Sequence, residues 1–143
     1  MGEKPNVKQA VPFFAVSDMG ASLAFYVDGL GFEIGGKWEK DGQIRWCQLQ
    51  LGGAALMLQQ HRTEGHDSWV PECKVGEGVA IAFLCEDAVA LYRQFKERSV
   101  QASEPRVGNG QWVTEMADPD GYKMFFESYT DAEEGSLLSE VEK

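Results

Sequence analysis

The chain has 143 residues, of which 43% are hydrophobic and 25% charged, the composition of a globular protein that can form a core without disulfides. Its 23 acidic and 13 basic side chains give a net charge of −10, which argues against a general phosphate-backbone binder. The three cysteines lack metal-type spacing, and the first apolar run is too short to cross a membrane. We therefore expect a cytoplasmic protein with reduced thiols and with neither a nucleic-acid nor a membrane partner.

The first half of the sequence predicts a strand, a helix and three further strands. Residues 11–16 form an apolar run, and Ser17 or Asp18 can cap the amphipathic helix that follows. Strand-like runs at 37–40 and 44–51 flank the hairpin signal Asp41-Gly42, and a Gly-Gly turn leads into a third run at 54–60. These elements predict a βαβββ module within residues 8–60.

The second half repeats this order of elements at a shift of 68 residues. The apolar run 79–84 is followed by a helix cap at Glu86 or Asp87, an amphipathic stretch, and strand-like runs at 112–116 and 122–127. This order predicts a second βαβββ module within residues 78–130, joined to the first by a polar linker loop over 61–77. Residues 131–143 form an acidic C-terminal tail that is either a frayed helix or unstructured.

Three stretches of the sequence resemble the vicinal-oxygen-chelate superfamily, which includes glyoxalase I, extradiol dioxygenases and bleomycin-resistance proteins. They are VPFFAVSDMGASLAFYVDGLGF at 11–32, AIAFLCEDAVALYRQF at 80–95 and DPDGYKMFFE at 118–127, and the resemblance spans residues 8–130. It is closest to the bleomycin-resistance proteins, which both the start of the first module and the segment HRTE at 61–64 resemble. The resemblance implies an α+β fold in which two tandem βαβββ modules form cupped mixed sheets. It also implies a paired or swapped homodimer that encloses ligand cavities.

The resemblance further implies where a metal would bind, because metal-dependent members take His, Gln and Glu ligands from four strand positions. These positions fall on Val11 (Pro12 with a slip of one residue), Met57, Ala80 (Val79 with the same slip) and Phe125. Hydrocarbon side chains and a lone thioether do not bind a hard divalent ion, so we expect no metal and no cofactor. Gln59 and Glu127, two residues further along the closing strands, could form a displaced pair of donors.

Strand alternation predicts which side chains line a ligand cavity, with Met57 and Phe125 as markers of the cup face. The candidates for ligand binding are Phe13, Trp46, Gln48, Met57, Gln59, Trp112, Thr114, Phe125 and Glu127. The same rule assigns Ile44 and Met116 to the cup. Aromatic, sulfur and amide groups suit stacking on a planar molecule, and aromatic faces also attract cations. The same pattern is typical of a plain core or of a dimer interface.

Three functions remain open at this point. The hypothesis that we favour is a metal-free small-molecule-binding protein of the glyoxalase/bleomycin-resistance type, a homodimer that sequesters an aromatic or cationic compound without turnover. The second is a metal-dependent lyase or dioxygenase that uses Gln59 and Glu127 as displaced ligands. The third is a non-catalytic interaction module with a filled cavity. The sequence has no nucleophile with an adjacent base and no Gly-rich phosphate loop to support another chemistry.

Overall fold

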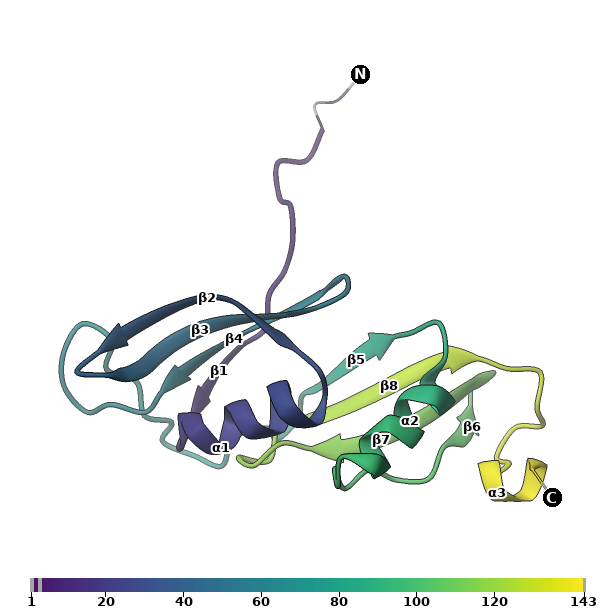
Figure 1. Cartoon of the computed structure of the whole chain (residues 1–143). Coiled ribbons are helices and arrows are strands. Elements are labelled where there is room, and N and C mark those ends of the chain that lie inside the picture. Colours follow the sequence, from purple (N-terminus) through teal and green to yellow (C-terminus); the bar gives the residue numbers. More distant parts are fainter. Residues whose placement is uncertain (1, 3, 143) are drawn as a thin grey trace.

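The computed structural model describes residues 2 and 4–142 and contains two four-stranded mixed sheets (Figure 1). The first sheet has the order β1-β4-β3-β2, with β1 parallel to β4 and the other neighbours antiparallel. We call this unit the N-module. Its elements are β1 (Phe13–Val16), α1 (Met19–Leu23), the π-type helical segment η1 (Ala24–Gly29) that continues α1, β2 (Glu33–Lys40), β3 (Gln43–Leu51) and β4 (Ala54–Gln60).

The second sheet has the equivalent order β5-β8-β7-β6, again with one parallel pair, β5 and β8. We call this unit the C-module. Its elements are β5 (Ala80–Leu84), α2 (Ala88–Glu97), β6 (Arg106–Gly108), β7 (Gln111–Ala117) and β8 (Lys123–Tyr129). The prediction of an α+β fold built from two βαβββ modules is therefore confirmed. No helix within the described residues is both long and apolar enough to span a membrane.

The two helices begin at aspartates that the sequence offered as caps. The carboxylate of Asp18 accepts a hydrogen bond from the Ala21 amide at 3.1 Å, and that of Asp87 accepts one from the Ala90 amide at 3.0 Å. Each bond satisfies an amide of the first helical turn that has no partner within the helix. Of the two residues offered in each half, the second is therefore the cap.

A buried core joins the two modules of the chain, which lie side by side (Figure 1). The rings of Phe14 and Tyr122 stack with centroids 4.0 Å apart, and the Tyr122 hydroxyl donates to the Ala15 carbonyl at 3.0 Å. The Tyr26 hydroxyl donates to the Asp118 carboxylate at 2.7 Å, and both side chains are buried. Burial raises the pKa of the Asp118 carboxyl, and the hydrogen bonds that it accepts partly offset this rise.

The acidic segment after β8 ends in a short helix, α3 (Leu138–Val141). Leu138 is buried with Val107 and Trp112 against the helix-covered side of the C-module. The neighbouring Leu137 forms a bridge to Arg106 at the free edge of β6. Within the described part of this segment, a helix therefore forms only over residues 138–141, whereas residues 131–137 reach it without helical structure, and the helix is packed against the module.

Each sheet has one face under its helix and one face without a helix, which we call the open face (Figure 1). Leu56 and Leu58 of β4, and Met124 and Phe126 of β8, are almost fully buried on the helix side. Side chains alternate along a strand, so Met57 and Phe125 lie on the open faces. Both are only partly buried. The open faces are where the sequence analysis placed its candidate site.

Candidate functional site

The open face of the N-module brings five of the predicted residues together. Phe13 on β1 and Gln48 on β3 are both register partners of Met57 on β4, and Trp46 is the partner of Gln59. Cross-strand partners project to the same side of a sheet, so these five side chains form one surface. Trp38 on β2 is the partner of Trp46 and extends this surface to the outer strand. The result is an aromatic and amide-bearing face.

A bulge in β3 alters one part of the predicted face. The pairing of β2 with β3 shifts between Trp38 and Glu39, so that Arg45 is the extra residue between Ile44 and Trp46. Arg45 is turned to the open face, where its guanidinium lies 5.8 Å from the centre of the Trp38 ring. Ile44 packs against the helix-side core instead. The prediction that Ile44 lines the cup is therefore wrong, because the bulge reverses the alternation.

The prediction of the cup face is also wrong for Trp112, Thr114 and Met116 on β7. These residues are register partners of Ser128, Phe126 and Met124, which lie on the helix side of β8. Their exposed fractions are 8%, 0% and 6%. The Thr114 hydroxyl donates to the Ser103 carbonyl at 2.6 Å. Trp112 and Thr114 are thus core residues in this chain and not members of the open face.

The physical reason for this error is the length of the turn between the last two strands of each module. The β3–β4 turn consists of Gly52 and Gly53, whereas the β7–β8 turn runs over residues 118–122. The longer turn offsets the second pairing by one residue relative to the first. Because side chains alternate with a period of two, such an offset moves every side chain of β7 to the other face. The sequence analysis assigned the faces of β7 by analogy with β3 through the 68-residue shift, and this assignment was therefore reversed.

The open face of the C-module carries Phe125 and Glu127, as predicted from strand alternation, and two residues that the prediction missed. Glu115 is the register partner of Phe125, and Val113 is the partner of Glu127. The Asp-Pro-Asp-Gly sequence at 118–121 is typical of a turn longer than two residues. That signal could have indicated that Glu115 lies on the open face. Neither Glu115 nor Glu127 takes part in an ion pair with another described residue. This face therefore carries two carboxylates without an ion-pair partner among the described residues, together with an aromatic ring and the basic side chains of Lys123 on β8 and of Arg106, the register partner of Val113.

A hollow of about 480 Å³ lies at the β6 edge of this open face. Its lining includes Arg106, Val113, Glu115 and Leu137. Leu137 belongs to the acidic C-terminal segment, which thus contributes one side chain to the open face and the next, Leu138, to the core. The segment widens the C-module surface beyond its last strand.

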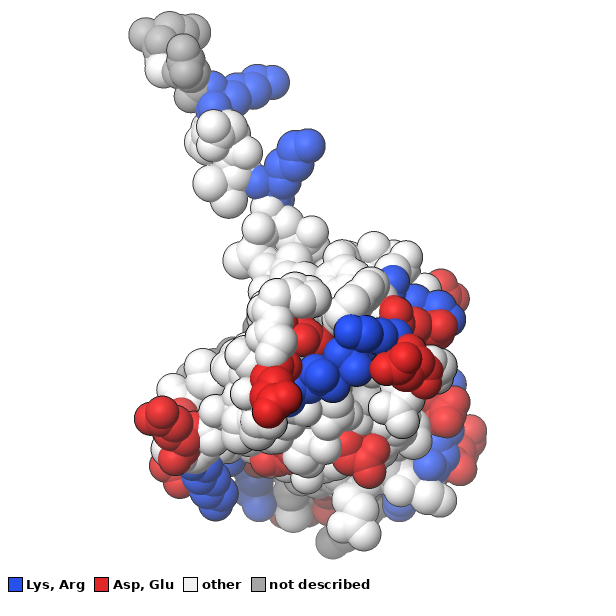
Figure 2. All heavy atoms as spheres, turned by 90° about the vertical axis from the view of Figure 1, so that its left-hand side faces the viewer, with Lys and Arg blue, Asp and Glu red and all other residues white. Residues whose placement is uncertain are grey.

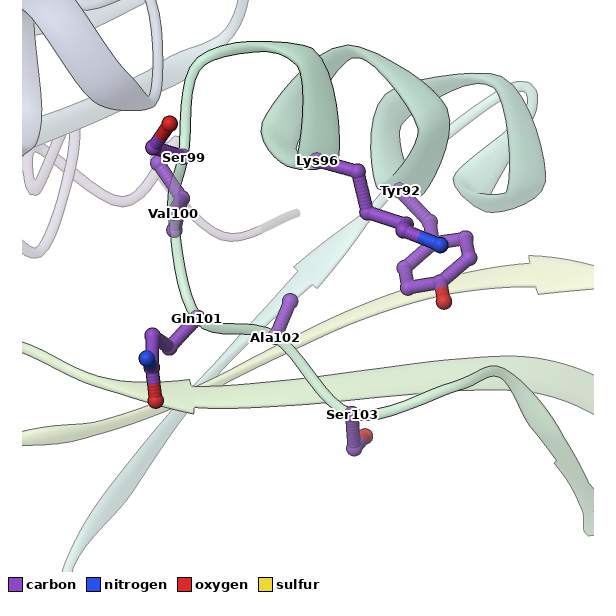
Figure 3. Close-up of a pocket in the computed structure, with 7 residues that line it drawn as sticks. All are labelled: Tyr92, Lys96, Ser99, Val100, Gln101, Ala102 and Ser103. Carbon is purple, nitrogen blue, oxygen red and sulfur yellow. The ribbon is translucent and has the colours of Figure 1, made fainter.

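A larger hollow, of about 630 Å³, lies beside α2 and shares only Ser103 with the hollow at the β6 edge (Figure 3). It lies between the C-terminal half of α2 and the segment 99–103, and Tyr92, Lys96 and Gln101 are among its lining residues. Lys96 already lies over the Tyr92 ring, with its ammonium 5.5 Å from the ring centre. None of the residues predicted for ligand binding lines this hollow, so it provides a place for control substitutions.

The four positions that the resemblance implies for metal ligands carry no suitable donors in this chain. Val11, Met57, Ala80 and Phe125 occupy them, and the described residues contain no group of three or more His, Cys, Asp and Glu side chains arranged to hold an ion. Gln59 of the displaced pair is engaged elsewhere, because its amide nitrogen donates to the Asp67 carbonyl at 2.6 Å. Burial raises the pKa of the Cys47 thiol to about 11, which keeps it protonated and unreactive.

Comparison with known proteins finds similar proteins over most of the chain. The family model of the Glyoxalase/Bleomycin resistance protein/Dioxygenase superfamily matches residues 8–126. The antibiotic binding protein TnmS3 from Streptomyces sp. CB03234 is 22% identical, with a TM-score of 0.64 over 86% of this chain and 98% of that one. TioX from Micromonospora sp. ML1 is 17% identical, with a TM-score of 0.67 over 87% of this chain and 100% of that one.

A glyoxylase/bleomycin resistance protein/dioxygenase domain from Frankia sp. EAN1pec is 16% identical, with a TM-score of 0.66 over 90% of this chain and 96% of that one. No curated protein matches the sequence. Identities in this range show a common fold, and function has to be argued from the side chains of the site.

Proposed function

The chain belongs to the glyoxalase/bleomycin resistance protein/dioxygenase superfamily, and from this membership we propose that it binds a small molecule without metal, cofactor or turnover. The binding cavity forms between the open face of one N-module and the open face of one C-module in a cytoplasmic homodimer. One solved relative, TnmS3, is described as an antibiotic binding protein, which supports a ligand-sequestering role. The side chains on the open faces carry the argument further.

The observation that carries this proposal is the exposure of large apolar side chains on the open faces of the single chain. Phe13 is 42% exposed and Trp38 is 37% exposed on the N-module, while Leu84 and Tyr129 on the C-module are 79% and 76% exposed. Contiguous apolar patches on a soluble protein mark surfaces that bind a ligand or a partner chain. Pairing of the two faces would cover these side chains and enclose the aromatic surface as a cavity.

The charges of the two faces indicate the class of ligand. The N-module supplies Phe13, Trp38 and Trp46 for stacking, and the C-module supplies the carboxylates of Glu115 and Glu127. Aromatic faces and unpaired carboxylates both favour a positive charge, and a protein with a net charge of −10 attracts cations at a distance. The ligand that fits is a planar aromatic molecule with a cationic substituent.

The residues that we propose for the cavity are those of the earlier prediction that lie on the open faces, together with the two that it missed. They are Phe13, Trp46, Gln48, Met57, Gln59, Val113, Glu115, Phe125 and Glu127. Trp112 and Thr114 are not included. The lining offers hydrocarbon, aromatic and thioether groups at its centre, so binding rests on shape, stacking and charge rather than on coordination.

A matched pair of substitutions tests the proposal. Gln48→Lys places a cation on the N-module open face, whereas Gln101→Lys places the same cation in the larger hollow beside α2. Titration of tryptophan fluorescence with a panel of cationic dyes, including acridine orange and crystal violet, should show saturable binding to the wild type. Gln48→Lys should weaken it by about tenfold or more, and Gln101→Lys should leave it unchanged.

Three results would overturn the proposal. The first is the absence of saturable binding across the dye panel, and the second is equal weakening by both lysine variants. The third is stoichiometric divalent metal in the purified wild-type protein, because that result favours a metal-dependent lyase or dioxygenase. Loss of the metal in a Glu127→Gln variant would then identify the displaced donors.

A further inference from the structure

The first part of the loop between the modules, residues 61–69, folds back on the N-module as a closed strap. The His61 amide donates to the Val16 carbonyl at 2.8 Å, so the strap begins where β4 ends (Figure 1). Two backbone hydrogen bonds between Arg62 and Trp69, of 2.8 and 3.4 Å, close its base. A further bond from the Ser68 amide to the Gly65 carbonyl, of 3.1 Å, tightens its tip. We call residues 61–69 the strap.

The strap contacts all four strands of the N-module sheet. Trp69 packs edge-on against Phe13 of β1, with ring centres 5.1 Å apart, and His66 packs against Trp38 of β2 at 5.3 Å. Between these ends, Asp67 accepts a hydrogen bond on its carbonyl from Gln59 of β4. All of these sheet residues lie on the open face. The strap therefore crosses the same surface that we propose for ligand binding.

Asp67 anchors the centre of the strap through its carboxylate. One carboxylate oxygen lies 3.9 Å from the Arg45 guanidinium on β3, and the other lies 3.4 Å from that of Arg62 within the strap. The exposed fractions of the Asp67 and Arg45 side chains are only 10% and 12%. Charges buried to this degree depend on each other, because removal of one leaves the other without compensation in a poorly solvated place. The bulge that turns Arg45 to the open face thus also fastens the strap.

Acidic and basic side chains are interleaved over this end of the molecule (Figure 2). Arg45 is paired with Asp67 and lies over Trp38, so its charge is compensated within the protein. What the strap leaves available is aromatic surface, since Trp69 and Trp38 are each 37% exposed. This end of the open face therefore suits the planar part of a ligand rather than its charged part.

We propose that the strap is a wall of the binding cavity, with Trp69 as a specificity-determining contact for planar ligands and Asp67 as the residue that positions it. This inference rests on the proposed function of the open face. It assigns the planar part of the ligand to the N-module end and its cationic part to Glu115 and Glu127 of the C-module. It also gives a role to a segment that the sequence analysis assigns to the linker loop between the modules.

The test uses three variants of the full chain and two dyes. Asp67→Asn removes the anchoring charge, Trp69→Leu removes the aromatic contact without disturbing a buried charge, and Glu64→Gln is the matched control because it neutralises an exposed carboxylate of the same strap. Acridine orange is planar, whereas crystal violet is a propeller-shaped cation. Dissociation constants are measured for both dyes. Fluorine NMR of protein labelled with 5-fluorotryptophan follows the four tryptophans without any ligand.

We expect Asp67→Asn and Trp69→Leu to weaken acridine orange binding by about tenfold and crystal violet binding by less than about threefold, with Glu64→Gln close to wild type. The Trp69 resonance should shift and sharpen in Asp67→Asn as the strap is released. Equal weakening of both dyes, or wild-type binding by both variants, overturns the role of the strap while leaving the proposed function intact. Absence of dye binding to the wild type overturns both. If Asp67→Asn does not fold, the Trp69→Leu variant decides the question, through the loss of affinity for acridine orange relative to the loss for crystal violet.

Discussion

Replacement of Trp112 by Phe tests the strand register on which the site depends. Trp112 is 8% exposed and packs with Val107, Leu138 and the partly buried Tyr92 on the helix side of the C-module. Complete truncation of such a residue to alanine costs about 3–5 kcal/mol, and retention of one ring should reduce the loss to about 1–2 kcal/mol. Trp46→Phe is the matched variant on the open face. Since Trp46 is only partly buried, its loss should be about 0.5 kcal/mol.

The assay combines urea unfolding with titration by acridine orange. We expect Trp112→Phe to lower the free energy of unfolding while the dissociation constant of the dye stays within about twofold of wild type. Trp46→Phe should show the opposite pattern, with nearly unchanged stability and weaker dye binding. The reasoning is refuted if Trp112→Phe weakens the dye without loss of stability, because Trp112 would then face the ligand and the register of β7 with β8 would be different.

Two further predictions concern pH and assembly. Burial raises the pKa of Asp118 in the folded protein above the value of about 3.9 for an unfolded aspartate, so the folded state binds the additional proton. Its contribution to stability is therefore full below that value and is lost as the pH rises through the folded-state pKa. Urea unfolding at several pH values should show that the free energy of unfolding falls less with rising pH in Asp118→Asn than in the wild type. An equal fall in both proteins would contradict the raised pKa of Asp118. Leu84→Asp, at an apolar side chain 79% exposed on the C-module open face, should weaken a homodimer at least tenfold in sedimentation equilibrium, since about 1.5–3 kcal/mol of leucine burial is lost. The control Val141→Asp, on α3, should leave the dimer dissociation constant unchanged. A wild-type protein that remains monomeric at high concentration would refute the paired arrangement.

The sequence by itself was sufficient for the architecture of this protein. The repeat, the order of elements in each module and the capping aspartates all follow from local patterns: apolar alternation, acidic caps before amphipathic stretches, and glycine turns. These patterns depend on the neighbours of a residue in the chain, so they can be read without any tertiary contact. The open-face positions of Met57, Gln59, Phe125 and Glu127 follow from alternation within a single strand in the same way.

The tertiary structure decided which side chains of one strand face those of the next. The five-residue turn at 118–122 reversed the face of Trp112 and Thr114, and the bulge at Arg45 reversed that of Ile44, because a shift of one residue inverts a pattern with a period of two. Contacts between distant segments likewise brought the strap across the open face and Leu138 into the core. Such contacts depend on how separate elements pack against each other, which no local pattern in the chain encodes.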